Sequence, residues 1–159
     1  MSINEAKHGE VGLFTTMIAS GPVIIEEKDG IEKTLLVKHG DKPVPELKWK
    51  FPGGKVIKDS TLEGNAVREA IEEIGREVTL LSPLKPMLLW NEATDSAKEN
   101  ESEAPQATVL IHYLAKLTGE PVQGKEILAM QWFALDALPP DCSPNIAPVI
   151  EDYLRSKPL

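Results

Sequence analysis

Three glutamates, Glu69, Glu72 and Glu73, lie close together near the middle of the chain. If their segment is helical, a rotation of about 100° per residue places the three carboxylates within an arc of about 100°. Like charges at these spacings each cost about 0.2–0.5 kcal/mol in an isolated helix, and near its C-terminus they oppose the helix dipole. Carboxylate oxygens are the ligands that hard divalent cations such as Mg²⁺ prefer. The cluster therefore indicates a metal site.

A second interpretation gives the glutamates no chemistry. They would form a solvated acidic face, balanced by Arg68 and Arg76. The preceding segment 51–54, Phe-Pro-Gly-Gly, favours the metal site, because paired glycines at a strand end let backbone carbonyls approach a ligand closely. Gly64 costs a helix about 1 kcal/mol relative to Ala, which indicates close packing over that loop.

The segment FPGGKVIKDSTLEGNAVREAIEEIG resembles the Nudix box of the Nudix hydrolases. That motif runs Gly, five residues, Glu, seven residues, then Arg-Glu-apolar-any-Glu-Glu-any-Gly-apolar. Within residues 54–76 the chain matches it without a gap at Gly54, Arg68, Glu69, Ala70, Glu72, Glu73 and Gly75. Ser60 stands where the family has its first Glu, and Arg76 where it has an apolar residue. We expect Ser60 to cap the helix, and Asp59 or Glu63 to supply the missing charge.

The resemblance implies that water attacks phosphorus in a diphosphate bond of a nucleoside diphosphate derivative or nucleoside triphosphate. It also implies Mg²⁺, for which Mn²⁺ can substitute. Glu72 and Glu73 are then the main metal ligands, the Gly53 carbonyl is a further ligand, and Glu69 is a ligand or the general base. Arg68 is expected to pair with a helix glutamate and orient it. The substrate is a small nucleotide-type molecule, and triphosphates, nucleotide sugars and dinucleotides all stay open.

Acidic residues outside the motif give weaker signals. Glu126 is a candidate metal ligand or base, or else a solvated loop acid. The polar stretch 91–106 is either a solvated loop or a lid that carries a catalytic carboxylate. Its glutamates compete for that role: Glu92, Glu99, Glu101 and Glu103.

Basic and aromatic side chains outside the helix allow two interpretations each. Lys55 contacts a phosphate or is a plain surface lysine. Three aromatic residues in strand-like segments either stack on a base or pack in the core: Trp90, Tyr113 and Trp132. His39 and His112 show no metal-ligand spacing, so we expect structural roles for both.

The elements that must position these residues are mostly strands. Apolar patterning predicts them at 11–19, 22–25, 34–38, 48–51, 77–81, 86–90, 107–117 and 127–133, with an Asp29–Gly30 hairpin turn. Helices are expected at 61–74, with a capping box at 60–63, and near 146–154, with Asn145 as cap and Pro148 at the third position. The pattern predicts an α+β fold, and the resemblance implies a Nudix-type α/β/α sandwich with a mixed β-sheet flanked by helices. We expect residues 1–159 to form a single Nudix hydrolase domain.

The charge of the chain limits its partners. Its 159 residues include 17 Lys+Arg and 25 Asp+Glu, a net charge of −8, which argues against binding to nucleic-acid polymers or anionic membranes. Small phosphorylated ligands stay open, because a bound cation can neutralise them. One cysteine gives no disulfide framework, no apolar run reaches the roughly 18 residues of a membrane span, and the start lacks a signal peptide. We expect a cytoplasmic location, and a homodimer stays open.

The two departures from the motif support a hypothesis of a different class. A Nudix fold can sense a nucleotide-like metabolite as a non-catalytic binding module. A third hypothesis is a protein-interaction domain, in which Mg²⁺ would leave the melting temperature unchanged.

Overall fold

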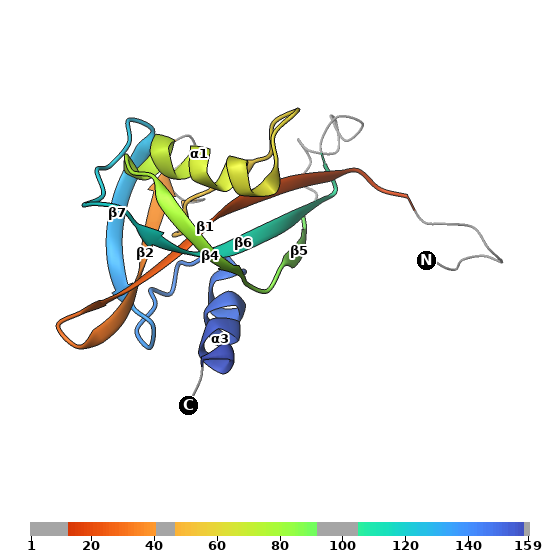
Figure 1. Ribbon diagram of the computed structural model, residues 1–159. Coiled ribbons are helices and arrows are strands. Elements are labelled where there is room, and N and C mark those ends of the chain that lie inside the picture. The colour runs from red at the N-terminus through yellow and green to blue at the C-terminus, as the bar shows by residue number, and fades with distance from the viewer. Residues whose placement is uncertain (1–12, 41–46, 92–104, 158–159) are drawn as a thin grey trace.

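The computed structural model describes residues 13–40, 47–91 and 105–157. Its elements are β1 (Thr16–Lys28), β2 (Ile31–His39), β3 (Gly54–Lys55), α1 (Leu62–Ile74), β4 (Val78–Pro83), β5 (Met87–Trp90), β6 (Ala107–Leu117), β7 (Ile127–Ala134) and α3 (Ile146–Ser156). The seven strands form one sheet with the main order β4-β6-β1-β2-β7, while β3 pairs with β1 and β5 with β6. Helices α1 and α3 lie on opposite faces of this sheet (Figure 1). The prediction of an α+β fold with a mixed sheet flanked by helices is confirmed.

Strand β1 joins the parts of the sheet. It pairs in parallel with β6, from Thr16 opposite Ala107 to Ile24 opposite Ala115. Its other edge pairs antiparallel with β3 at its first half and with β2 at its second half. The two apolar stretches that the sequence suggests at 11–19 and 22–25 therefore belong, within the described residues, to one strand.

Pro22 lies inside β1, although proline cannot donate to a strand ladder. Ile18 accepts a hydrogen bond from Val56 on the β3 side, so the two-residue alternation turns the Pro22 nitrogen to that side too. There, pairing with β3 ends at Ser20 and pairing with β2 begins only at Ile25. The missing N–H thus falls between two partner strands, where it costs no ladder bond.

The turn between β1 and β2 has the expected form. Asp29 and Gly30 adopt φ angles of 57° and 80°, as the two central residues of a type I′ turn require. The strand that was expected over 48–51 is reduced to isolated bridges, at Trp49 and Lys50. The expected alternation is present, because Trp49 and Phe51 are buried while Lys48 and Lys50 are not, and Trp49 packs edge-on against Phe133.

The N-cap of helix α1 lies one residue later than the sequence predicts. Thr61, not Ser60, is the N-cap, because the Thr61 hydroxyl accepts the backbone N–H of Gly64 at 2.9 Å. Gly75 ends the helix in the left-handed region, with φ 66° and its N–H bonded to Ile71. The apolar face of α1 packs its Ala70 and Ile74 against strands β1, β2, β4, β6 and β7.

Helix α3 closes the opposite face through Ile146, Val149, Ile150 and Tyr153. The packing role, the position of Pro148 and the position of Asn145 as N-cap residue agree with expectation, but the Asn145 side chain does not cap the helix. Asn145 makes no capping hydrogen bond, and its amide instead contacts His112 Nε2 at 2.9 Å. His112 is buried and bonds through Nδ1 to the Lys85 carbonyl, so its expected structural role is supported.

Gly21 brings β1 against the backbone of the Pro52–Gly53 loop. A Cβ on Gly21 would overlap the Pro52 carbonyl oxygen and lie 2.7 Å from the Gly53 Cα. Because the obstructing atoms belong to the backbone, no side-chain movement can relieve the overlap. The absence of a side chain at Gly21 therefore sets how closely the loop approaches β1.

Gly21→Ala is expected to lower the free energy of unfolding by about 1–3 kcal/mol, the usual cost of overpacking. In urea, the midpoint should fall while the m-value stays constant. Gly30→Ala is the control, because an added Cβ there has no atom within 4 Å and only the positive φ opposes it. It should cost about 1 kcal/mol, the lower end of the penalty for a Cβ in the left-handed region. Equal losses in the two variants would contradict the close approach.

Candidate metal centre

The loop before β3 presents its backbone to helix α1. Gly53 has a φ of 152°, within the region that favours glycine, and its N–H donates to Glu73 Oε1 at 3.1 Å. A Cβ on Gly54 would overlap the Glu69 carboxylate. The paired glycines therefore allow two carboxylates of α1 to lie directly against the loop. The sequence predicted a close approach through the backbone carbonyls, whereas the observed hydrogen bond is donated by the Gly53 N–H.

Glu69 and Glu73 lie one helical turn apart and are both buried, each with 8% of its surface exposed. Burial, together with the neighbouring charge of Glu73, raises the pKa of Glu69 to about 7. The guanidinium of Arg68 opposes this shift without cancelling it. Ionisation of Glu69 is therefore unfavourable in this position, because burial and the charge of Glu73 outweigh the guanidinium.

Arg68 bridges two of the three helix glutamates. Its Nη2 donates to Glu69 Oε2 at 2.9 Å, and its Nη1 donates to Glu72 Oε2 at 2.7 Å. The Glu72 side chain is 56% exposed, so its pair with Arg68 lies near the surface. The pairing that was expected of Arg68 is present. Arg76 does not join it, and instead donates to the Gly75 carbonyl.

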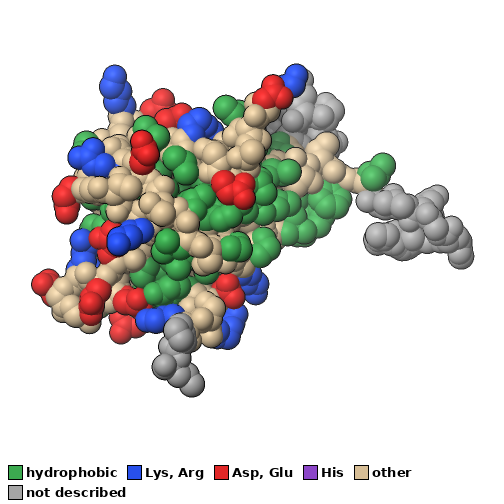
Figure 2. All heavy atoms as spheres, in the orientation of Figure 1, with side chains coloured by type: hydrophobic (Ala, Val, Ile, Leu, Met, Phe, Trp, Pro, Cys, Tyr) green, Lys and Arg blue, Asp and Glu red, His purple; other side chains and the backbone are tan. Residues whose placement is uncertain are grey.

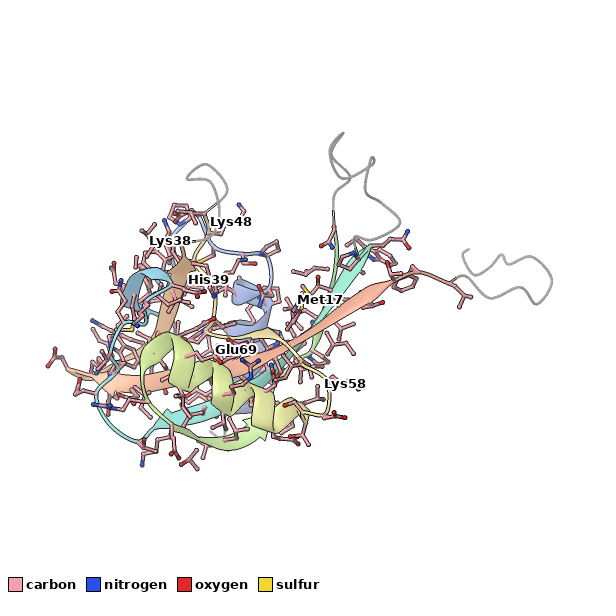
Figure 3. All side chains as sticks on the ribbon, turned by 90° about the horizontal axis from the view of Figure 1, so that it is seen from above. Met17, Lys38, His39, Lys48, Lys58 and Glu69 are labelled. Carbon is pink, nitrogen blue, oxygen red and sulfur yellow. The ribbon has the colours of Figure 1, made fainter. Side chains whose placement is uncertain are left out.

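His39 is a neighbour of the site that sequence reasoning missed. It stands at the end of β2, and its Nε2 lies 2.7 Å from Glu73 Oε2. Figure 3 labels His39 and Glu69 on the two elements that converge here. The expectation of a purely structural histidine rested on sequence spacing, which contains no signal for a contact between residues 34 positions apart.

A model of the NUDIX domain family matches residues 16–153, a region that contains all the strands, helix α1 and the converging carboxylates. The chain belongs to the Nudix family. Solved structures with a similar fold include a MutT NUDIX hydrolase from Burkholderia pseudomallei, with 28% identity over 86% of this chain and 97% of that chain and a TM-score of 0.67. A search of curated proteins gives no match.

Two further similar structures have lower identity. An Ap4A hydrolase from C. elegans has 19% identity, over 87% of this chain and 96% of that chain, with a TM-score of 0.67. An ADP-ribose pyrophosphatase from Streptococcus suis has 24% identity, over 89% and 94%, with a TM-score of 0.60. Both support the Nudix-type sandwich.

The donor set of the Nudix motif suits a hard divalent cation. Glu69, Glu72 and Glu73 offer carboxylate oxygens. Burial, with the charge of Glu73, raises the pKa of Glu69, so a nearby cation would favour its ionised form. Within residues 13–40, 47–91 and 105–157, no three His, Cys, Asp or Glu side chains already form a metal-binding group. One of the three carboxylates, that of Glu72, is instead paired with the guanidinium of Arg68.

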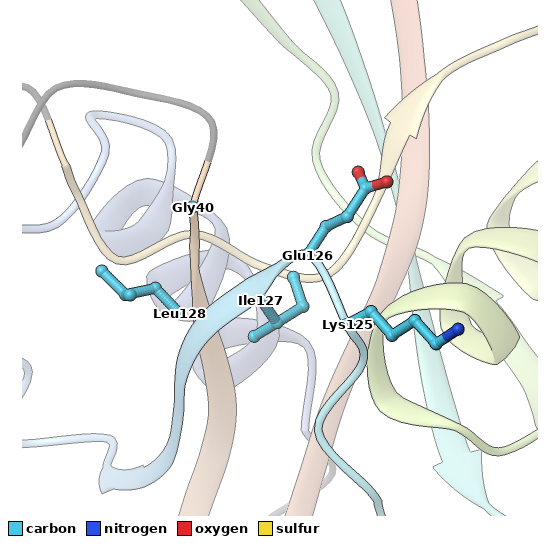
Figure 4. Close-up of a pocket in the computed structure, with 5 residues that line it drawn as sticks. All are labelled: Gly40, Lys125, Glu126, Ile127 and Leu128. Atoms are coloured by element: carbon cyan, nitrogen blue, oxygen red, sulfur yellow. The ribbon is translucent and has the colours of Figure 1, made fainter.

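Glu126 lies at the edge of this region. Its carbonyl accepts the Gly40 N–H at 2.9 Å, which places its backbone beside the residue that follows His39. With Gly40, Lys125, Ile127 and Leu128 it lines a shallow cavity of about 360 Å³ (Figure 4). Within the part of the chain that the structure describes, its carboxylate forms no hydrogen bond or ion pair. The competing glutamates Glu92, Glu99, Glu101 and Glu103 lie outside the described residues.

The candidate stacking and phosphate-binding residues are dispersed. Trp132 packs in the core beneath Lys28, which agrees with the packing alternative. Trp90 is 59% exposed and its ring contacts Phe14. Figure 2 shows apolar side chains gathered on the face over β5 and β6. Lys55 meets Arg68 only through its backbone carbonyl, at 3.4 Å.

No described helix is both long enough and apolar enough to cross a membrane.

Glu69→Gln is expected to leave the melting temperature of the metal-free protein at pH 8 unchanged or higher, because it removes one charge from a buried like-charged pair. Adding Mg²⁺ should raise the melting temperature of the wild type by mass action, and raise that of the variant less. Glu151→Gln, on the exposed face of α3, is the control and should respond to Mg²⁺ like the wild type. Equal Mg²⁺ responses in all three proteins would contradict a cation site at Glu69.

Proposed function

We propose that this Nudix protein hydrolyses a diphosphate bond in a small nucleotide-type molecule, with Mg²⁺ as cofactor and Mn²⁺ as a substitute. The observation that carries the proposal is the buried pair Glu69 and Glu73, held against the Gly53–Gly54 backbone and adjoined by Glu72. A diphosphate repels an anionic nucleophile, so its hydrolysis needs a site that concentrates positive charge. The three carboxylates beside the Gly53–Gly54 backbone can bind a cation, which supplies this positive charge.

Each glutamate of the α1 motif has a separate role in the proposal. Glu72 and Glu73 are the proposed main ligands, with the Gly53 carbonyl as a further one. When bound, Mg²⁺ would neutralise phosphate charge and lower the pKa of a water molecule. Glu69 serves as ligand or as general base, and its buried carboxylate lies one helical turn from Glu73.

Arg68 and Glu126 have supporting places in the proposal. Arg68 orients Glu69 and Glu72 through its two short hydrogen bonds. Glu126 is retained as an additional ligand, because its backbone is bonded to Gly40, next to the histidine that contacts Glu73. This role requires the Glu126 side chain to turn toward the helix glutamates.

The substrate class comes from what the similar structures have in common. They are a MutT NUDIX hydrolase, an Ap4A hydrolase, an ADP-ribose pyrophosphatase and a UDP-X diphosphatase. The last three names describe a nucleoside joined to another group through a phosphate chain. We therefore propose a nucleoside diphosphate derivative or nucleoside triphosphate as substrate.

A hydrolysis screen with Mg²⁺ and with Mn²⁺ tests the proposal directly. The panel holds nucleoside triphosphates, nucleotide sugars and dinucleoside polyphosphates, and the readout is release of phosphate, pyrophosphate or a nucleoside monophosphate. Metal-dependent turnover of at least one compound is expected. Tight binding of a panel compound without turnover would instead support the non-catalytic binding module.

Glu72→Gln and Glu73→Gln are each expected to lower turnover of that compound 10²-fold or more, about 2.7 kcal/mol of transition-state stabilisation. Glutamine keeps the size of the side chain and an oxygen that can accept the Gly53 N–H, so both variants should fold. Glu151→Gln should retain wild-type kcat and KM. Full Mg²⁺-dependent hydrolysis in both motif variants would refute the assignment of the site, whatever the fold.

A further inference from the structure

Asn65 is a polar side chain in a fully buried position of α1. It has no solvent-exposed surface and lies near the start of the helix, where its backbone N–H bonds to Thr61. The position falls among the seven that the Nudix motif leaves undefined between Ser60 and Arg68. A buried amide has to be satisfied on both its donor and its acceptor side, so its partners show what it does.

The partners of Asn65 come from three different segments. Its Nδ2 donates to the Gly54 carbonyl at 3.0 Å and to Ser20 Oγ, on β1, at 3.1 Å. Its Oδ1 accepts from Arg68 Nη2 at 2.6 Å. Because Arg68 can only donate and the Gly54 carbonyl can only accept, a single orientation of the amide satisfies both.

The contact with Arg68 extends the network to the carboxylates. The Nη2 atom that Asn65 accepts from also donates to Glu69, and the other arm of the guanidinium donates to Glu72. Ser20 completes the network on the other side, because its hydroxyl donates to the Leu62 carbonyl. The Asn65 amide therefore connects strand β1, the Gly53–Gly54 loop and the guanidinium of Arg68.

We infer that Asn65 is the positioning residue of this site, which fixes Arg68, and through it Glu69 and Glu72, relative to the carbonyl edge of the Gly53–Gly54 loop. The inference rests on the proposed function. Asn65 touches none of the reacting groups itself. Ser60, at the position of the missing motif glutamate, makes no such connection, since its hydroxyl donates to the adjacent Thr61 carbonyl.

Other side chains at position 65 would break the network in different ways. Aspartate would keep an acceptor for Arg68, but it would set a buried carboxylate oxygen against the Gly54 carbonyl and add charge beside Glu69. Alanine would remove both ends and leave the Gly54 carbonyl without this donor. Only a group that donates on one side and accepts on the other serves both partners at once.

Asn65→Ala and Asn145→Ala form a matched pair for the test, because both delete a buried amide and only Asn65 adjoins the site. Mn²⁺ affinity, measured by paramagnetic resonance of the free ion, should weaken about 10–100-fold in Asn65→Ala, and kcat should fall while KM changes little. Asn145→Ala should melt at a lower temperature yet bind Mn²⁺ like the wild type. All proteins are compared at a temperature where they are folded.

A double-mutant cycle with Arg68→Ala tests the route of the effect. If Asn65 acts through Arg68, then Asn65→Ala should weaken Mn²⁺ binding much less in the Arg68→Ala background than in the wild type. Should Asn65→Ala fail to fold, Asn65→Ser, which keeps a short polar group, takes its place in both comparisons.

Three results would overturn the inference. They are wild-type Mn²⁺ affinity in the Asn65 variant, an equal loss in Asn145→Ala, or additive losses in the cycle. Failure of the proposed function is distinct, because a wild type that binds Mn²⁺ and hydrolyses no panel compound refutes the hydrolase while the Mn²⁺ comparison still decides the role of Asn65. A wild type that does not bind Mn²⁺ refutes both.

Discussion

The repulsion between two buried carboxylates, Glu69 and Glu73, is the constraint around which the rest of the site is arranged. Each lies almost out of solvent, one turn from the other, and the pKa of Glu69 is raised to about 7 as a result. Donors from separate parts of the chain surround the pair: Arg68 from the same helix, the Gly53 N–H from the loop and His39 from the end of β2. Such a cluster lowers the stability of the fold unless a ligand compensates for it, and this is the physical argument for a cation-dependent activity.

Local patterns in the sequence predict the elements well, because alternation and helical periodicity are local properties. The bounds expected for β6 agree with the structure, as does the Asp29–Gly30 turn. The motif in residues 54–76 also predicts a site formed by helix glutamates and the Gly53–Gly54 loop. In the structure, Glu69 and Glu73 lie against that loop. In each case the information lies within one element or within a short segment of fixed spacing.

The wrong predictions concern side chains with a choice of partner. Ser60 and Asn145 both have the residue types of helix caps, yet Thr61 caps α1 and the Asn145 amide contacts His112. His39 and Asn65 were not recognised as neighbours of the site. The partner of His39 lies on helix α1, and the Asn65 amide nitrogen bonds to β1 and to Gly54, which are distant in sequence. Propensity describes what a side chain can bond to, whereas the choice among partners depends on tertiary structure.

The parallel pairing of β1 with β6 has a consequence for how the site comes into being. It joins segments far apart in the chain, and Thr15 bonds to Gln106, 91 positions away. Contacts of such high contact order form late in folding, because loop closure costs entropy before any contact compensates for it. Until β1 docks, Ser20 and Gly21 are missing from beneath the glycine loop, and α1 is a helix of mutually repelling acids. Because the helix carboxylates, the glycine loop and β1 meet only when the sheet is closed, the proposed cation site would exist in the fully folded chain and not in a collapsed intermediate.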